Sequence, residues 1–140
     1  MKYYIIILLL LLTNTLAYSQ VKKVRQGKHS FTIQWITFNK SNPGNVFIKE
    51  IGDEEYSIEG EHRDAKTKDY VTIKGTFLNQ GNILKFNGTI ISKINHINGG
   101  QPCELKGLSI FKASGKRKYW RLQQMLNCDG QTTDYIDIFF

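Results

Sequence analysis

The stretch from Cys103 to Cys128 constrains the fold more than any other part of the chain. It reads CELKGLSIFKASGKRKYWRLQQMLNC, with Gly115-Lys116 at its midpoint. A Gly-X pair at such a midpoint is typical of a two-residue type II′ hairpin turn. Folding the stretch about this turn sets Cys103 opposite Cys128 and Phe111 opposite Trp120. Directly opposed strand residues have Cα atoms about 4.5–5.5 Å apart, which suits a disulfide. The stretch therefore predicts a disulfide-linked β-hairpin.

Alternating apolar and polar residues predict strands along the rest of the chain, and helix-length periodicity is absent. The expected strands, besides the two of the hairpin, cover residues 31–38, 46–51, 56–63, 70–78, 83–94 and 134–140. In the first strand Phe31, Ile33 and Trp35 share the inward face, and in the last strand Ile136, Ile138 and Phe140 do. Short turns join the strands, so the pattern predicts an eight-stranded antiparallel meander.

Closing the last strand onto the first removes both exposed sheet edges. We therefore expect an all-β fold, an antiparallel eight-stranded up-and-down barrel, with a two-sheet β-sandwich as the alternative. An apolar-x-Gly step recurs in four strands, at residues 58–60, 73–75, 86–88 and 105–107. Glycines within strands mark bends where a curved sheet closes, and we expect Gly75 to lie opposite Phe86.

The chain begins MKYYIIILLLLLTNTLAYSQ, with a charged start, an apolar run and a small-x-small pattern at Ala17-Tyr18-Ser19. The apolar run is too short to span a hydrocarbon core of about 30 Å, so residues 1–19 are predicted to be a cleaved export signal. Residues 20–29 are expected to form a flexible basic arm, and residues 30–140 a single barrel domain. The protein is thus expected to be periplasmic or secreted, where a cysteine pair is oxidised.

The formal net charge is +7, which favours anionic partners such as acidic glycans or lipid headgroups, while nucleic acid is the less favoured partner. Solubility alone is the alternative explanation. A basic and aromatic patch is expected on the outward side and tip of the hairpin, where the register sets Lys112 opposite Tyr119. Its residues are Lys112, Lys116, Arg117, Lys118, Tyr119 and Arg121. Arginine binds phosphate and sulfate groups bidentately, so this patch is the candidate surface site.

A second candidate site lies inside the predicted barrel. Its expected residues are Trp35, His62, Phe86, Trp120 and Gln124. Gln124 falls between Leu122 and Leu126 on the inward face, and a buried amide needs hydrogen-bond partners. Those partners could belong to the protein, or to a small apolar or amphipathic ligand in a mostly apolar cavity. For His62, a hydrogen-bonded structural role is the alternative.

Catalytic and metal-binding patterns are absent from the sequence. His29, His62 and His96 form no HxH, HxxxH or HExxH spacing, and two cysteines alone lack the ligand count for a metal site. Carboxylates cluster in the turn Asp53-Glu54-Glu55, but no pattern sets two of them across one pocket. No Ser-His-Asp order can be defended. We expect no cofactor and no enzymatic activity. The leading hypothesis is ligand binding in the barrel, and the alternative is binding of an anionic envelope partner through the basic hairpin face.

The eight-strand meander resembles calycins, the small-ligand barrels of lipocalin and avidin type, which implies a ligand-binding role. Their Gly-x-Trp signature is missing, because Trp35 follows Ile33 and Gln34, so no binding residue is carried over. The C-terminal part resembles a group of small exported bacterial proteins without an assigned function. The resemblance lies in Asn98-Gly99-Gly100, Pro102-Cys103, residues 115–121, Asn127-Cys128 and residues 134–138. The end of the signal, Ala17-Tyr18-Ser19 before Gln20, is similar to export signals of Bacteroidetes-type bacteria, which implies export.

Overall fold

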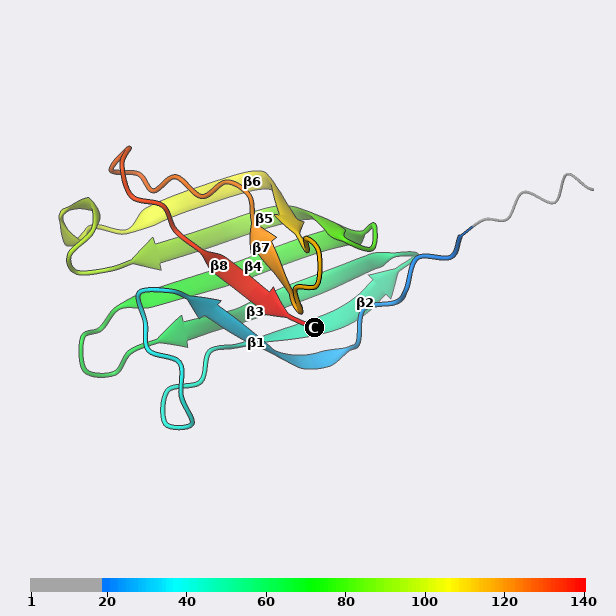
Figure 1. Ribbon diagram of the computed structural model, residues 1–140, viewed down its shortest axis with the longest axis horizontal. Coiled ribbons are helices and arrows are strands. Elements are labelled where there is room, and N and C mark those ends of the chain that lie inside the picture. The colour runs from blue at the N-terminus through cyan, green and yellow to red at the C-terminus, as the bar shows by residue number, and fades with distance from the viewer. Residues whose placement is uncertain (1–18) are drawn as a thin grey trace, which may run out of the picture.

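The computed structural model describes residues 19–140, and its eight strands form one closed antiparallel barrel in which each strand pairs with the next and β8 pairs with β1 (Figure 1). The strands are β1 (Gly27–Ile33), β2 (Asn45–Gly52), β3 (Glu55–Arg63), β4 (Tyr70–Asn79), β5 (Ile83–Lys93), β6 (Cys103–Lys112), β7 (Tyr119–Leu122) and β8 (Ile136–Phe139). Phe31 of β1 lies opposite Ile138 of β8, which closes the wall. The prediction of an up-and-down barrel rather than a sandwich is confirmed.

Residues 1–18, with most of the predicted export signal, lie outside the described residues. Among residues 19–140 the helical segment η1 (Asn98–Gly100) has three residues, and no helix in this range is long and apolar enough to cross a membrane.

Large apolar side chains of neighbouring strands pack against one another inside the barrel. Phe86 and Phe111 pack edge to face with ring centroids 5.9 Å apart, and Tyr56 stacks on Phe77 at 5.2 Å. Phe86 and Phe111 are each 1% exposed, and Tyr56 is 0% exposed. Alternation along each strand brings these rings to one side of the wall, where burial removes them from water. The interior around these rings is therefore a packed core.

The glycine steps lie where neighbouring strands approach closely. Gly75 pairs with Gly88 rather than with Phe86, so the expected register between β4 and β5 is wrong by two residues. The ring of Phe86 nevertheless covers both glycines, because a Cβ at Gly75 or Gly88 would lie 2.9 or 2.7 Å from its atoms. The missing side chains thus leave room for an aromatic ring, as expected of glycines at a bend.

The hairpin forms, but its strands pair two residues away from the predicted register. Phe111 lies opposite Leu122 and Lys112 opposite Arg121, so the expected pairs Phe111–Trp120 and Lys112–Tyr119 are wrong. The turn itself is where the sequence predicts it, since Arg117 N donates to Ser114 O at 3.2 Å and Gly115 has φ +59°. β6 ends at Lys112 and β7 begins at Tyr119, and between them the Lys118 carbonyl accepts a hydrogen bond from Phe140 N at 3.1 Å.

The disulfide between Cys103 and Cys128 is present, with Cα atoms 5.5 Å apart, as predicted. The strand that should join it to the turn is short, because β7 ends at Leu122 and residues 123–135 follow an irregular path. Gln124 is exposed rather than inward, and its Oε1 accepts a hydrogen bond from Ile110 N at 3.0 Å. Leu126 is 67% exposed. The inward prediction failed here because alternation holds only while the chain stays in the ladder.

The first and last strands also differ from the predicted ones. β1 begins at Gly27, so residues 27–29 belong to the barrel rather than to the arm, and it ends at Ile33. Trp35 follows the strand and is 37% exposed, so its predicted inward position is wrong. Phe140 follows β8 and is 49% exposed, against the same expectation.

Candidate functional site

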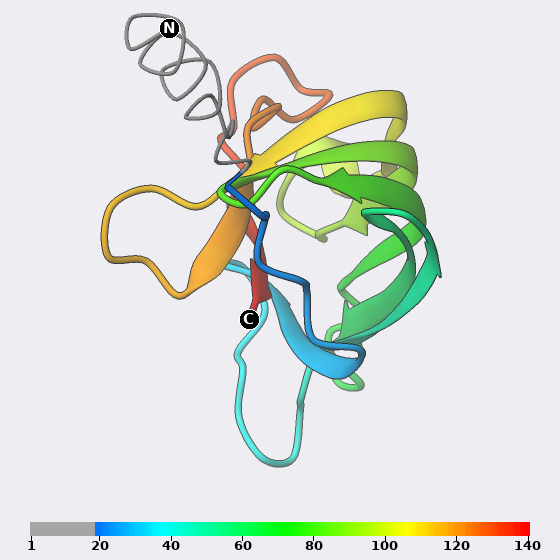
Figure 2. The ribbon, with the colours of Figure 1, turned by 90° about the vertical axis from the view of Figure 1, so that its right-hand side faces the viewer.

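The basic arm, residues 19–26, runs across one end of the barrel (Figure 2). Two hydrogen bonds hold it there: Asn79 Nδ2 donates to Lys22 O at 2.9 Å, and Val24 N donates to the hydroxyl of Tyr56 at 3.3 Å. Val24 is 7% exposed and belongs to the main apolar core. An apolar side chain in the middle of the basic run Lys22–Arg25 therefore anchors the arm.

His29 at the start of β1 ties the arm to the last strand. Its ring lies between two carbonyl oxygens, with Nε2 2.6 Å from Arg25 O and Nδ1 2.7 Å from Phe139 O. The side chain is 1% exposed. His29 was predicted to lie in a flexible arm, but it belongs to β1 and its buried ring supports this end of the barrel.

The docked arm forms one wall of a cleft of about 340 Å³, which we call the arm cleft. Its floor is aromatic, since Trp120 and Phe140 pack with ring centroids 4.4 Å apart. The indole Nε1 of Trp120 donates to Gly81 O at 3.0 Å, which fixes the ring against the β4–β5 turn. The remaining lining residues are Lys22, Lys23, Val24, Arg25 and Asn82. Among residues 19–140, the cleft lining therefore has three cations and no carboxylate around an aromatic floor.

The cations around the arm cleft differ in their partners. Lys23 Nζ lies 3.0 Å from Glu50 Oε1, and this hydrogen bond raises the pKa of Lys23. Arg25 Nη2 donates to Lys28 O at 2.8 Å. Within residues 19–140, Lys22 forms no ion pair. Because the Lys23 side chain is 71% exposed, its pairing with Glu50 is readily exchanged for another anion.

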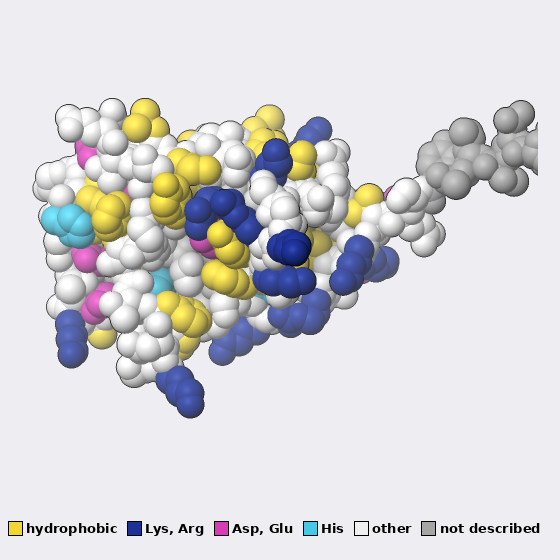
Figure 3. All heavy atoms as spheres, in the orientation of Figure 1, with side chains coloured by type: hydrophobic (Ala, Val, Ile, Leu, Met, Phe, Trp, Pro, Cys, Tyr) yellow, Lys and Arg dark blue, Asp and Glu magenta, His cyan; other side chains and the backbone are white. Residues whose placement is uncertain are grey.

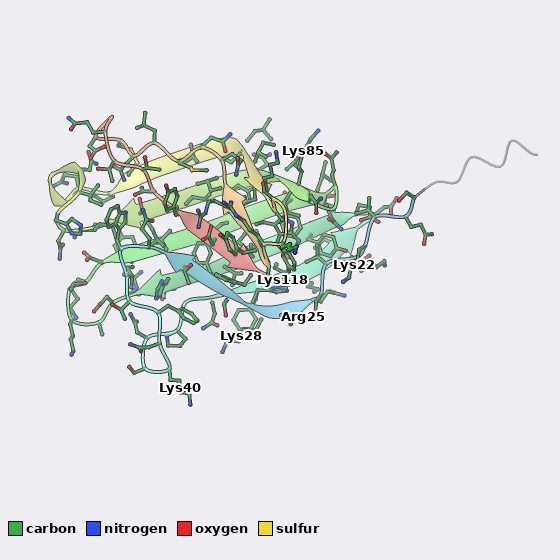
Figure 4. The ribbon with its side chains drawn as sticks, viewed as in Figure 1. Lys22, Arg25, Lys28, Lys40, Lys85 and Lys118 are labelled. Atoms are coloured by element: carbon green, nitrogen blue, oxygen red, sulfur yellow. A yellow bond between two sulfur atoms is a disulfide. The ribbon has the colours of Figure 1, made fainter. Side chains whose placement is uncertain are left out.

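Cations also gather beside the cleft. In Figure 3 the Lys and Arg side chains of this face lie mainly over the arm, the β6–β7 turn and the adjoining part of β1. In the view of Figure 4, Lys22, Arg25 and Lys118 lie toward the same end of the barrel, and Lys40 lies away from them on the β1–β2 loop. A field of one sign around a cleft attracts counter-charged ligands.

The residues of the predicted hairpin patch fall into two groups in the structure. Lys112, Lys116, Arg117 and Lys118 are exposed. Arg121 instead forms a two-pronged ion pair with Asp137, Nε to Oδ1 and Nη2 to Oδ2, both at 2.7 Å, which raises the pKa of Arg121. Its guanidinium also lies 4.3 Å from the ring centroid of Tyr135 and 5.1 Å from that of Tyr119. Arg121 and Tyr119 are thus engaged with protein groups, and Arg117 also lies 5.6 Å from the Tyr119 ring centroid. Among residues 19–140, Lys112, Lys116 and Lys118 form no ion pair.

The five residues predicted to line a ligand cavity do not come together. Trp120 lines the arm cleft, whereas Phe86 is packed in the core. Trp35 lies at the opposite end of the barrel, where its Nε1 donates to Asp134 Oδ1 at 2.9 Å. Gln124 is exposed beside β6, where its Oε1 accepts from Ile110 N, and it lines a separate cleft in the side of the barrel.

His62 is buried, as its strand position predicts, beneath the β1–β2 loop. It is 0% exposed, its Nε2 lies 3.3 Å from Asn42 O, and its Nδ1 has no partner among the described residues. The ring packs against Phe38 with centroids 5.9 Å apart, and a side chain at Gly44 would collide with it. Burial lowers the pKa of His62, so the ring is held neutral in the folded protein.

Sequence reasoning missed Val24, Asn79 and Phe140 as parts of a site. Val24 carried a usable signal, because a single apolar residue within the run KKVR is unusual for a solvated arm. Asn79 and Phe140 carried none, because their roles depend on the arm lying over the barrel end. Within residues 19–140 no group of three or more His, Cys, Asp or Glu side chains could hold a metal ion.

Comparison with known proteins places the chain in a family. The model of the PM1083 family matches residues 14–140. The uncharacterized protein PM1083 of Pasteurella multocida (strain Pm70) is similar, with 33% identity over 125 residues that cover 87% of this chain and 77% of the relative. No solved structure matches. The family model covers the whole barrel and the relative most of the chain, so this chain belongs to the PM1083 family.

Proposed function

We propose that this protein is an exported, non-enzymatic binding protein whose arm cleft takes an anionic amphiphile. The observation that supports this most directly is the composition of the cleft. Lys22, Lys23 and Arg25 border the rings of Trp120 and Phe140, and no carboxylate of residues 19–140 lines it. The export signal expected in the sequence and the Cys103–Cys128 disulfide support an oxidising compartment outside the cytoplasm.

Each half of such a ligand has a complementary surface. A carboxylate, phosphate or sulfate group would accept hydrogen bonds from the Lys ammonium groups and the Arg25 guanidinium, and such charge-assisted bonds are the stronger ones. The apolar half would lie against Trp120 and Phe140 and lose contact with water. The cleft volume of about 340 Å³ is at the lower end of the roughly 300–1,000 Å³ typical of ligand sites, which favours a small amphiphile.

The packed interior favours this surface cleft over a ligand on the barrel axis. Phe31, Phe86 and Phe111 fill space that a calycin-type ligand would need, and none of them is more than 1% exposed. Opening that space would break close packing, which costs stability. An amphiphile bound in the arm cleft, with contacts to both the aromatic rings and the basic side chains, therefore agrees better with the structure than a ligand on the barrel axis.

Octyl phosphate is a suitable probe, and tryptophan gives a local readout. The chain has two Trp residues, and the indole N–H of Trp120 lies in the arm cleft. Titration followed by ¹⁵N-resolved NMR should shift the Trp120 indole resonance, assigned with a Trp35→Phe variant. Octanol and octylamine should shift it much less at equal concentration. Binding should weaken with added salt, because exposed charges are screened within about 10 Å at 0.1 M.

A charge-matched pair of variants tests the assignment. Lys22→Ala/Lys23→Ala should weaken octyl phosphate binding by about tenfold, which corresponds to about 1.4 kcal/mol. Lys40→Ala/Lys66→Ala removes the same charge from exposed positions elsewhere and should leave affinity nearly unchanged. Equal losses in both variants would indicate attraction by net charge alone, and an unperturbed Trp120 resonance would exclude the arm cleft as the site.

A further inference from the structure

A second and larger cleft, of about 540 Å³, opens in the side of the barrel between β6 and residues 122–128. We call it the side cleft. Its apolar walls include Ile90, Leu105, Leu122 and Ile136. Ile90, Leu122 and Ile136 are 2–3% exposed members of the core. The side cleft therefore reaches from the surface to the core.

The side cleft exists because β6 and its partner separate between two fixed points. Pairing of β6 with β7 ends at Phe111 and Leu122, and the Cys103–Cys128 disulfide holds the other end with Cα atoms 5.5 Å apart. Between these points the described hydrogen bonds across the gap are those of Ile110 with the backbone N of Gln123 and the side chain of Gln124. The intervening wall is open to a ligand.

The charge of the side cleft is opposite to that of the protein. Of the described residues, those lining it include two carboxylates, Asp134 and Glu104, and no Lys or Arg, although the chain carries a net charge of +7. Asp134 is 5% exposed. Its Oδ1 accepts from Trp35 Nε1 at 2.9 Å and its Oδ2 from Asn127 Nδ2 at 2.7 Å, both neutral donors. Among residues 19–140 it has no cationic partner.

A buried carboxylate without a cation is unusual, because buried charges are normally paired. We infer that the side cleft binds a small apolar cation, of the alkylammonium class. The ammonium group, which has three donors and no acceptor, would pair with Asp134, whose oxygens retain acceptor capacity. The alkyl chain would lie along Leu105 and Leu122, and Glu104 at the rim would add to the attraction. This site shares no lining residue with the arm cleft and does not depend on the function proposed for it.

The test uses octylamine below its aggregation concentration, with octanol and octyl phosphate as matched probes. The indole N–H of Trp35 donates to Asp134 and reports on the side cleft, while that of Trp120 reports on the arm cleft. Octylamine should shift the Trp35 resonance and leave that of Trp120 nearly unchanged, and octyl phosphate should do the reverse. Octylamine that shifts neither resonance, or that binds no better than octanol, would overturn the inference.

Two kinds of variant distinguish the effect of the cleft's charge from that of its volume. Asp134→Asn should weaken octylamine binding by at least about tenfold, as expected for loss of a charged hydrogen-bond acceptor. Leu105→Trp should block the cleft without changing its charge. Glu59→Gln removes an exposed carboxylate from the outward side of β3 and should have no effect.

The Asp134→Asn change also alters the partner of Trp35 and Asn127, so its fold is checked by the NMR spectrum. If that variant does not fold, Leu105→Trp and Glu104→Gln decide the question. Both should reduce octylamine affinity, and full affinity in both would contradict the inference.

Discussion

The two clefts of this barrel have opposite charge and are built in different ways. In the part of the chain that the structure describes, the arm cleft is lined by three cations and no carboxylate, and the side cleft by two carboxylates and no cation. Each has one of the two tryptophans at or beside it: Trp120 forms the floor of the arm cleft, and Trp35 donates to Asp134 of the side cleft. A net charge of +7 therefore does not describe the binding surfaces, because the sign at a site depends on which side chains the fold brings there.

The supports of the two clefts also differ. The arm cleft depends on the buried side chain of Val24 and on hydrogen bonds that join the arm to Tyr56 of β3 and Asn79 of β4. The side cleft depends on a covalent bond, because the disulfide holds residues 123–128 beside β6. Breaking one support should therefore alter one cleft and spare the other.

The largest effect is expected from removal of the disulfide in Cys103→Ser/Cys128→Ser. A closed loop of 25 residues contributes about 3 kcal/mol in the chain-entropy model, so the free energy of unfolding should fall by about that amount. Octylamine binding should be lost with it, while octyl phosphate still shifts the Trp120 resonance. Urea denaturation and the two-probe titration measure these effects. Loss of both ligands at a temperature where the variant is folded would show that the clefts are not independent.

A smaller effect is expected from Asn79→Ala. Asn79 is 3% exposed and its side chain donates to Lys22 O and Glu54 Oε2 and accepts from Gly81 N. Losing these bonds leaves buried groups unsatisfied, so the free energy of unfolding should fall by about 1–3 kcal/mol. The arm should detach, with weaker octyl phosphate binding and unchanged octylamine binding. Asn87→Ala, at an exposed position of β5, is the control and should change neither.

The smallest effect is expected from pH. It should be seen first at the end of the barrel that contains His62 and Trp35. The pKa of His62 is lowered by burial, so the unfolded chain takes up the proton before the folded protein does. Stability from neutral His62 is present above its unfolded pKa of about 6.5 and is lost as pH falls toward the folded value. His62→Gln should flatten this pH dependence of the urea midpoint between pH 8 and 5, whereas His96→Gln, at an exposed position, should retain it.

The same protonation should loosen the β1–β2 loop, which contains Trp35 and Phe38 and covers His62. The Trp35 indole resonance should therefore respond to falling pH while that of Trp120 stays constant. A response of Trp120 at the same pH would instead indicate a change that involves the whole barrel.

Local sequence patterns were enough to predict most of the strands that form the barrel. Alternation in β2 to β5 and the turns between them predicted these strands to within one residue at each end. The Gly115-Lys116 turn and the cysteine pair predicted the hairpin and its disulfide. A two-residue shift of register left Trp120 and Leu122 facing inward, because side-chain direction repeats every two residues.

The candidate sites were predicted only in part. Trp120 was predicted to bind a ligand inside an open barrel. It does face inward, but the cleft that it lines lies beside the arm at the end of a packed barrel. Arg121 was expected on a binding surface and instead pairs with Asp137. The partners that decide these roles are far away in sequence, and a one-dimensional pattern carries no information on which loops meet.

Strand period, turn type and cysteine spacing are local properties, so an antiparallel barrel with a Cys103–Cys128 disulfide could be predicted from them. The end of β7, the position of the arm and the charges that line each cleft depend on tertiary contacts. Those features arise where the chain leaves the ladder. Beyond that point, contacts between distant segments, rather than alternation, set the direction of each side chain.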